Sequence, residues 1–238
     1  MNTLSRAVLV MTLLAHNLMA EGERSADYDY DAPTPGTYSL PIIKTAADGR
    51  LLDSTGKPVQ LAELTRGRIT VMSFIYTRCT AAKACPYATG VLRQLHLQSE
   101  QDPSLAQSMR LVSLSFDPTH DTPERMTAYA RLASEKPSAA PWHFLTAASE
   151  RQLQPVLKAY GQAVDRRANP SDPAGPLNHT LRVFLIDRDG NIRNIYSAAT
   201  LDPRLVVADV RTLMLEKQSI QQPLPQAKLA DKQPNPVP

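Results

Sequence analysis

The stretch "ITVMSFIYTRCTAAKACPYATGVLRQL", residues 69–95, holds the order of elements that decides the fold. Its first part, residues 69–77, is rich in β-branched and aromatic side chains and has the length of a buried strand. A loop with both cysteines follows, and Pro86 can then occupy the first turn of a helix, where its missing N–H is no loss. Apolar residues at helical spacing continue from Val91 to Leu95. The stretch therefore predicts a strand, a cysteine loop and a helix.

Strands and helices alternate along the rest of the central region. Further strands are predicted at residues 109–116, 142–147, 181–187 and 192–197, and further helices at residues 121–134, 149–160 and 203–217. Asp121 and Ser149 each precede a Glu or Gln by three residues, as in a capping box. Strands joined by helices should be parallel, whereas the Asp189-Gly190 turn predicts an antiparallel hairpin. We therefore expect an α/β protein with a thioredoxin-like fold, in which parallel strands are followed by an antiparallel C-terminal hairpin.

The two ends of the chain differ in composition from the region between them. Residues 1–20 carry one charge, on Arg6, and an apolar run of nine residues before Ala20, which is typical of a cleaved secretory signal. That run is too short to span a bilayer, and nothing downstream approaches the required length. The expected segments after the signal are an acidic flexible stretch, one thioredoxin-like domain and a disordered Gln/Pro-rich tail, at residues 21–35, 36–217 and 218–238. We expect a periplasmic or otherwise exported protein with no membrane span after signal cleavage.

The small net charge of the chain argues against two classes of partner. The formal net charge is +3 at pH 7, and loss of the signal removes Arg6. So small a charge favours neither nucleic acid nor an anionic membrane as a partner.

Cys79 and Cys85 are the only two cysteines in the sequence. An exported protein enters an oxidising compartment, where an unprotected pair of thiols tends to become a disulfide. With no other cysteine available, these two must pair with each other or bind a metal ion. A purely structural disulfide across so short a loop would contribute only roughly 2 kcal/mol on the chain-entropy model.

The predicted topology places other candidate residues beside the cysteines. In an open α/β sheet, ligands gather beyond the carboxyl ends of the parallel strands. The cysteine loop leaves one such end, and a loop that contains Asp117 and His120 leaves the next. An antiparallel strand that begins at Leu181 would start at the same edge and bring His179 there. We therefore expect the cysteines, Asp117, His120 and His179 to converge.

Three segments of the sequence resemble one family. They are "FIYTRC" (residues 74–79), "SLSFDPTHDTPE" (113–124) and "NHTLRVFLIDRDGNI" (178–192), and a proline follows the second cysteine. With these features the chain resembles the Sco/SenC copper proteins over roughly residues 37–215. Members of that family have a thioredoxin fold with a cysteine pair on a loop and a distant histidine. These residues bind Cu(I) or Cu(II) and help to metallate the binuclear copper site of cytochrome oxidase.

The resemblance implies a site and a function for this chain. The matching segments make Cys79, Cys85 and His179 the implied copper ligands, with Asp117 as the nearby acid. Asp117 could either cap the loop after its strand or orient His179. The implied function is that of a metallochaperone rather than an enzyme. Its partner would be a cuproenzyme subunit, such as one of cytochrome c oxidase, or another periplasmic redox or copper protein.

The spacing of the cysteines departs from the family pattern, but their chemistry still suits copper. The family usually has three residues between the cysteines and commonly a proline after the first, whereas this chain has five, and Thr80 follows Cys79. Thiolates suit Cu(I), and an imidazole added to two thiolates suits Cu(II). Zinc would prefer four ligands and would need His120 or Asp117 as the fourth.

Thiol–disulfide exchange is the alternative function, with Cys79 and Cys85 as the catalytic pair. Cys85 precedes a helix, whose N-terminus would stabilise its thiolate and lower its pKa. Disulfide oxidoreductases, however, have two residues between their cysteines. Asn178 and His179 occupy the stretch in which thioredoxins have a cis-proline, which favours metal binding over docking of a substrate peptide. Reduction of a client's cysteines in the periplasm is therefore kept as the second hypothesis.

Overall fold

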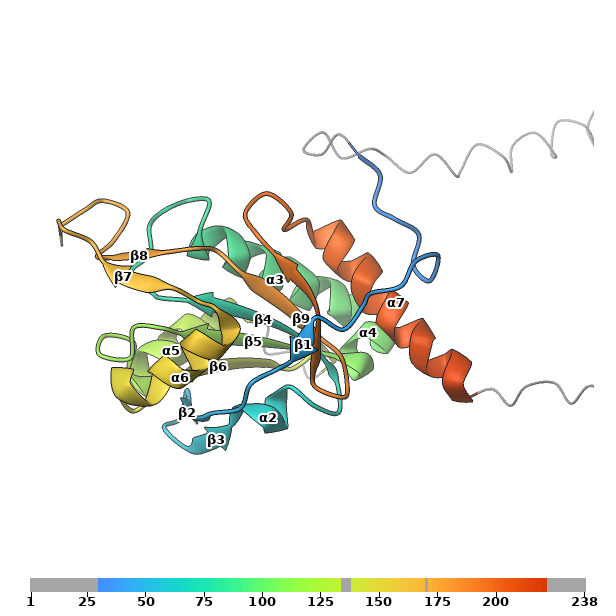
Figure 1. Cartoon of the computed structure of the whole chain (residues 1–238), viewed down its shortest axis with the longest axis horizontal. Helices are drawn as coiled ribbons and strands as arrows, with labels where there is room; N and C mark the ends of the chain where they lie inside the picture. Colours follow the sequence, from blue (N-terminus) through green and yellow to red (C-terminus); the bar gives the residue numbers. More distant parts are fainter. Residues whose placement is uncertain (1–29, 134–137, 170, 222–238) are drawn as a thin grey trace, which may run out of the picture. The chain divides into compact units, whose positions relative to one another are not determined.

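The computed structural model describes residues 30–133, 138–169 and 171–221 (Figure 1). The fold below is that of the described residues from Thr34 onward. The signal expected at residues 1–20, most of the acidic stretch after it, and residues 222–238 of the expected tail lie outside the described residues. No helix in the described ranges is long and apolar enough to cross a membrane.

A mixed sheet of eight strands forms the centre of the described structure, in the order β1-β10-β9-β4-β5-β6-β2-β3. The inner strands are β10 (Asn191–Tyr196), β9 (Val183–Ile186), β4 (Ile69–Ile75), β5 (Met109–Ser115) and β6 (Trp142–Thr146). The strands toward the edges are short: β1 (Lys44–Thr45), β2 (Arg50–Asp53) and β3 (Pro58–Gln60). A separate two-stranded sheet pairs β7 (Val164–Arg166) with β8 (Leu177–His179).

Strand directions follow the connections between the strands. β4, β5 and β6 are parallel neighbours, with Ile75 opposite Ser115 where β4 and β5 end. β9 lies antiparallel to β4, and β10 lies antiparallel to β9. All seven residues of β4 are buried because this central strand is covered on both faces. The expected thioredoxin-like α/β fold, with parallel strands and an antiparallel C-terminal hairpin, is confirmed.

Helices cover both faces of the sheet (Figure 1). α3 (Cys85–Gln101), α4 (Pro103–Ser108) and α7 (Pro203–Gln221) pack with Val71 of β4 in one apolar cluster. α5 (Pro123–Tyr129) and α6 (Glu150–Tyr160) pack with Met72 in the other cluster. Neighbouring residues of a strand point to opposite faces, so β4 contributes side chains to both layers.

Several elements differ from the pattern-based expectation. The expected helix at residues 121–134 ends as α5 followed by a short 3-10 turn, η1 (Ala130–Leu132). The predicted cap at Ser149 is present, with the Ser149 hydroxyl accepting a bond from Gln152 N. The predicted cap at Asp121 is wrong, because Thr122 occupies that position and Asp121 binds other residues. The short elements β1, β2, β3, α2 (Leu61–Leu64), α4, β7 and β8 were not predicted.

Candidate metal centre

The cysteine loop joins the carboxyl end of β4 to the first residue of α3. Cys79 N donates to the carbonyl of Tyr76 at 3.2 Å, which turns the chain as soon as β4 has ended. A second turn, in which Ala84 N donates to Ala81 O at 2.9 Å, returns the chain to Cys85. Both cysteines are buried free thiols.

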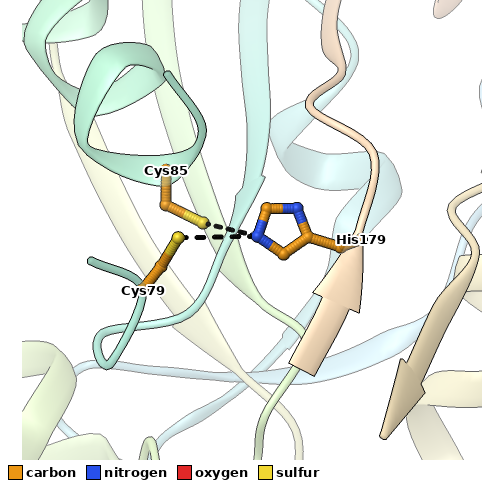
Figure 2. A group of neighbouring side chains, drawn as sticks. All are labelled: Cys79, Cys85 and His179. Carbon is orange, nitrogen blue, oxygen red and sulfur yellow. Dashed lines mark hydrogen bonds between the residues drawn. The ribbon is translucent and has the colours of Figure 1, made fainter. Parts of the chain in front are cut away.

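His179 faces both sulfur atoms (Figure 2). Its Nε2 lies 3.6 Å from Cys79 Sγ and 3.4 Å from Cys85 Sγ. His179 is the last residue of β8 and pairs with Val164 of β7, so the small sheet carries it to the carboxyl edge of the parallel strands. The structure thus brings Cys79, Cys85 and His179 together, with their ligand atoms all within 4.8 Å of one another.

Two aromatic rings enclose the imidazole. The ring centroid of Phe116 lies 5.0 Å from that of His179, and the Tyr76 ring meets the imidazole edge-on at 5.5 Å. His179 Nδ1 is buried and has no hydrogen-bond partner among the described residues. The two thiols at Nε2 and the packed rings therefore orient the imidazole, with no hydrogen bond at Nδ1 among the described residues. The sequence singled out neither aromatic residue, because both fit a strand pattern equally well as core residues.

Asp117 reaches the same edge but does not bind His179. Its carboxylate accepts a bond of 2.6 Å from Arg78 Nη2, and its carbonyl accepts bonds from His120 N and Asp121 N. The expectation that Asp117 orients His179 is therefore corrected. A guanidinium one residue before Cys79 is a charged donor, which a carboxylate prefers to a neutral imidazole.

His120 lies in the turn formed by Asp117 and is not part of the three-residue cluster. Burial and the nearby Arg78 and Arg125 lower the pKa of His120. Its backbone position is explained by the turn alone, in which His120 N donates to Asp117 O at 3.0 Å.

Asp121 holds the start of the cysteine loop by hydrogen bonds to Thr77. It is fully buried, and its carboxylate accepts bonds from the Thr77 N–H at 2.9 Å, the Thr77 hydroxyl and the Ser115 hydroxyl. These bonds join the ends of β4 and β5 just before Cys79. Sequence reasoning assigned Asp121 to a helix cap, and its spacing from Glu124 contains no sign of this second use.

The two thiols do not ionise alike. A hydrogen bond from the Cys85 thiol lowers the pKa of Cys79 against the effect of burial, and bonds from His179 and from backbone N–H groups add to the lowering. The Cys79 thiolate and burial together raise the pKa of Cys85. The expectation that a helix N-terminus lowers the pKa of Cys85 is therefore wrong. Cys85 is almost wholly buried beside a thiolate, and both effects disfavour a second negative charge.

The distances among the three residues suit a metal ion of the first transition row. Bonds of about 2.3 Å to sulfur and about 2.0 Å to nitrogen, as zinc forms, place two ligand atoms about 3.5 to 3.8 Å apart. The Sγ–Nε2 separations of 3.6 and 3.4 Å are close to this range. Two soft thiolates with one imidazole match the ligand preferences of copper in both oxidation states.

Comparisons with known proteins agree with the fold and show the family. A family model described as SCO1/SenC matches residues 44–215 of the chain. A protein of Stutzerimonas stutzeri with the name "Putative copper-binding protein" is 25% identical over 193 residues, which cover 81% of this chain and 87% of that protein.

Solved structures with the same fold extend the comparison. A SCO1/SenC family lipoprotein from Bacillus anthracis superimposes with a TM-score of 0.59 at 25% identity, covering 72% of this chain and 95% of that one. Arabidopsis thaliana ScoI, solved with copper bound, superimposes with a TM-score of 0.60 at 18% identity, covering 72% and 99%. At 18% identity, the likeness to the Arabidopsis protein shows a shared fold alone.

Proposed function

The chain belongs to the SCO1/SenC family, and we propose that it binds one copper ion through Cys79, Cys85 and His179 and delivers it to a cuproenzyme. The strongest support is the cluster itself, in which two sulfurs and one imidazole nitrogen lie within 4.8 Å of one another. Residues that are far apart in the sequence meet there through the fold.

The ligand set suits a protein that hands metal on. Two thiolates can hold Cu(I), and the imidazole adds the donor that Cu(II) prefers. Three ligands leave a coordination position for an incoming ligand of the client protein. Cytochrome c oxidase is the client we propose, because its assembly is the role that the family resemblance implies.

We also propose that the protein works outside the cytoplasm, in the periplasm of a bacterial cell. The signal-like residues 1–20 support export. In an oxidising compartment the two thiols would tend to form a disulfide, so loading with copper would require the reduced pair.

A second function is favoured by the lowered pKa of Cys79. A thiolate beside a buried thiol could attack a client disulfide and form a mixed disulfide with one client sulfur. Cys85 would then attack Cys79, release the client as a dithiol and leave a disulfide between Cys79 and Cys85. Two electrons pass to the client, and a dithiol reductant must restore the pair. Such a step could prepare a client's copper ligands for metallation.

One titration tests the copper proposal against this alternative. Reduced protein is mixed with Cu(II) without oxygen, and sulfur-to-copper charge-transfer absorption and bound metal are measured. We expect one copper per chain, with the bands lost in His179→Ala and retained in His120→Ala, since His120 lies outside the cluster. Tight binding that His179→Ala leaves unchanged would remove the imidazole from the site. Absence of binding together with rapid reduction of a disulfide substrate would favour the oxidoreductase.

A further inference from the structure

Tyr76 contacts both halves of the three-residue cluster. It follows β4 directly, and its carbonyl accepts the bond from Cys79 N that starts the cysteine loop. Its ring packs edge-on against His179, and only 1% of its surface is exposed. Tyr76 therefore contacts the cysteine loop through its backbone and His179 through its ring.

The hydroxyl of Tyr76 binds the segment that leads to His179. It donates to the carbonyl of Ala174 at 3.1 Å and to that of Leu177 at 3.3 Å. Leu177 begins β8, and its carbonyl also accepts a bond from Arg167. Of these two carbonyls, that of Ala174 therefore has Tyr76 as its only donor among the described hydrogen bonds.

Gly175 makes this close approach possible. It has φ +96°, a conformation that L side chains rarely adopt. A Cβ on Gly175 would lie 2.2 Å from the Tyr76 hydroxyl oxygen and 2.9 Å from the carbonyl oxygen of Arg78. The Thr80 hydroxyl also donates to the carbonyl of Pro173, so the same segment is held from the cysteine loop as well. The backbone before β8 is therefore packed directly against the end of β4.

Only the Nε2 side of the imidazole meets polar groups of the described residues, and these are the two thiols themselves. Metal-binding histidines usually donate their second ring nitrogen to a carboxylate or carbonyl, which fixes the ring. His179 Nδ1 has no such partner in the described part of the chain. Apart from the thiols, the backbone of β8 and the rings beside His179 therefore hold it in position. Tyr76 contributes to both.

We propose that Tyr76 is a positioning residue that holds His179 against the two thiols through its hydroxyl, and so favours Cu(II) binding over Cu(I) binding. The inference deepens the proposed function and rests on it. Cu(I) can be held by two thiolates, whereas Cu(II) gains from the added imidazole. Loosening the segment before His179 should therefore weaken Cu(II) binding and leave Cu(I) binding almost unchanged.

The test compares two buried tyrosines with hydrogen-bonded hydroxyls, of which only Tyr76 contacts the three-residue cluster. Tyr76→Phe removes the hydroxyl and keeps the ring. Tyr160→Phe is the matched control, because Tyr160 is equally buried and its hydroxyl donates to one carbonyl, that of Ala47, without contacting the cluster. Cu(II) and Cu(I) dissociation constants are measured for both variants, the unchanged protein and His179→Ala. The nitrogen splitting in the Cu(II) electron paramagnetic resonance spectrum reports on the imidazole directly.

We expect the Cu(II) dissociation constant of Tyr76→Phe to rise about tenfold, the equivalent of about 1.4 kcal/mol. The Cu(I) constant should stay within about twofold, and Tyr160→Phe should match the unchanged protein in both. The tenfold figure corresponds to the net worth of about one or two hydrogen bonds. Weakened or altered nitrogen splitting in Tyr76→Phe alone would add support.

Other results would overturn the inference. Unchanged Cu(II) binding in Tyr76→Phe, while His179→Ala weakens it, would end the role of Tyr76 and leave the proposed function intact. Equal losses for Cu(II) and Cu(I) would show general damage instead of positioning. Cu(II) binding that is absent from the unchanged protein, or unaffected in His179→Ala, would overturn the proposed function as well. If Tyr76→Phe does not fold, Thr80→Ala removes another bond to the same segment at an exposed residue and is judged by the same comparison.

Discussion

Asp121 binds Thr77 through both the backbone N–H and the side-chain hydroxyl, across a sequence separation of 44 residues. The same carboxylate accepts a bond from the Ser115 hydroxyl, so one buried acid joins the ends of two parallel strands. Thr77 lies two residues before Cys79. The cysteine loop therefore starts from a point that is fixed by polar bonds as well as by the sheet.

Asp121→Asn should destabilise the protein. An amide presents N–H donors where a carboxylate accepted bonds, so at least one buried donor would lose its partner. We expect the free energy of unfolding to fall by about 2 to 4 kcal/mol. Urea denaturation followed by circular dichroism measures this change. Asp165→Asn, the same change at an exposed residue of β7, is the control and should leave the denaturation midpoint unchanged. A midpoint for Asp121→Asn equal to that of the control would show that the buried carboxylate is dispensable.

Alkylation should distinguish the two thiols by pH. Since the folded pKa of Cys79 lies below that of a free thiol, about 8.5, its reactive thiolate should persist as the pH falls toward neutrality. The pKa of Cys85 is shifted upward, so its alkylation should require alkaline solution. Mass spectrometry of reduced, metal-free protein after short iodoacetamide pulses gives both rates. In Cys85→Ala, which lacks the neighbouring thiol donor, the profile of Cys79 should move to higher pH. Identical profiles for the two cysteines would contradict the asymmetry.

Buried tyrosines should make the protein sensitive to alkali. Burial raises the pKa of Tyr129 to about 12 and raises the pKa of Tyr160 and Tyr196 as well. Unfolded tyrosines release their protons near pH 10, whereas these three stay protonated in the folded state. Their contribution to stability is therefore complete below about pH 10 and is lost as the pH rises through the folded pKa values. Tyrosinate absorbance against pH should show a late group that titrates together with unfolding. A single transition near pH 10 in folded protein would refute this.

Gly175→Ala should destabilise the protein more than Gly67→Ala. Both glycines have positive φ, +96° and +79°, so both variants carry a similar backbone strain of about 1 kcal/mol. The new Cβ at Gly175 would also collide with the Tyr76 hydroxyl and a carbonyl, whereas at Gly67 it would meet nothing within 4 Å. Overpacking of this kind adds about 1 to 3 kcal/mol. Thermal and urea unfolding of the two variants, measured in parallel, isolates the effect of the collision. An equal loss in the free energy of unfolding for both variants would mean that the backbone around Gly175 moves to accommodate the new Cβ.

Local patterns were sufficient to predict the central strands and the helices that cover them. β4 is a continuous apolar run because both of its faces are buried, and Ser149 begins α6 with a cap that acts within one turn. Each of these signals lies within a few residues of the structure that it predicts. The edge strands and β7 and β8 were missed because they are short and partly exposed, so their sequences carry no apolar alternation.

The residue types of the site could be read from the chain, but their contacts could not. Two cysteines, a histidine before an apolar strand and the order of strands predicted that Cys79, Cys85 and His179 meet. The same reasoning also placed Asp117 and His120 there, and neither belongs to the cluster. Packing between distant segments decided the rest: Asp117 pairs with Arg78, Asp121 supports Thr77, and the Cys85 pKa rises. The same holds for the Tyr76 hydroxyl, which meets a backbone carbonyl 98 residues away. Hydrogen bonds and burial depend on distances of a few ångströms between such segments, and only the folded chain sets those distances.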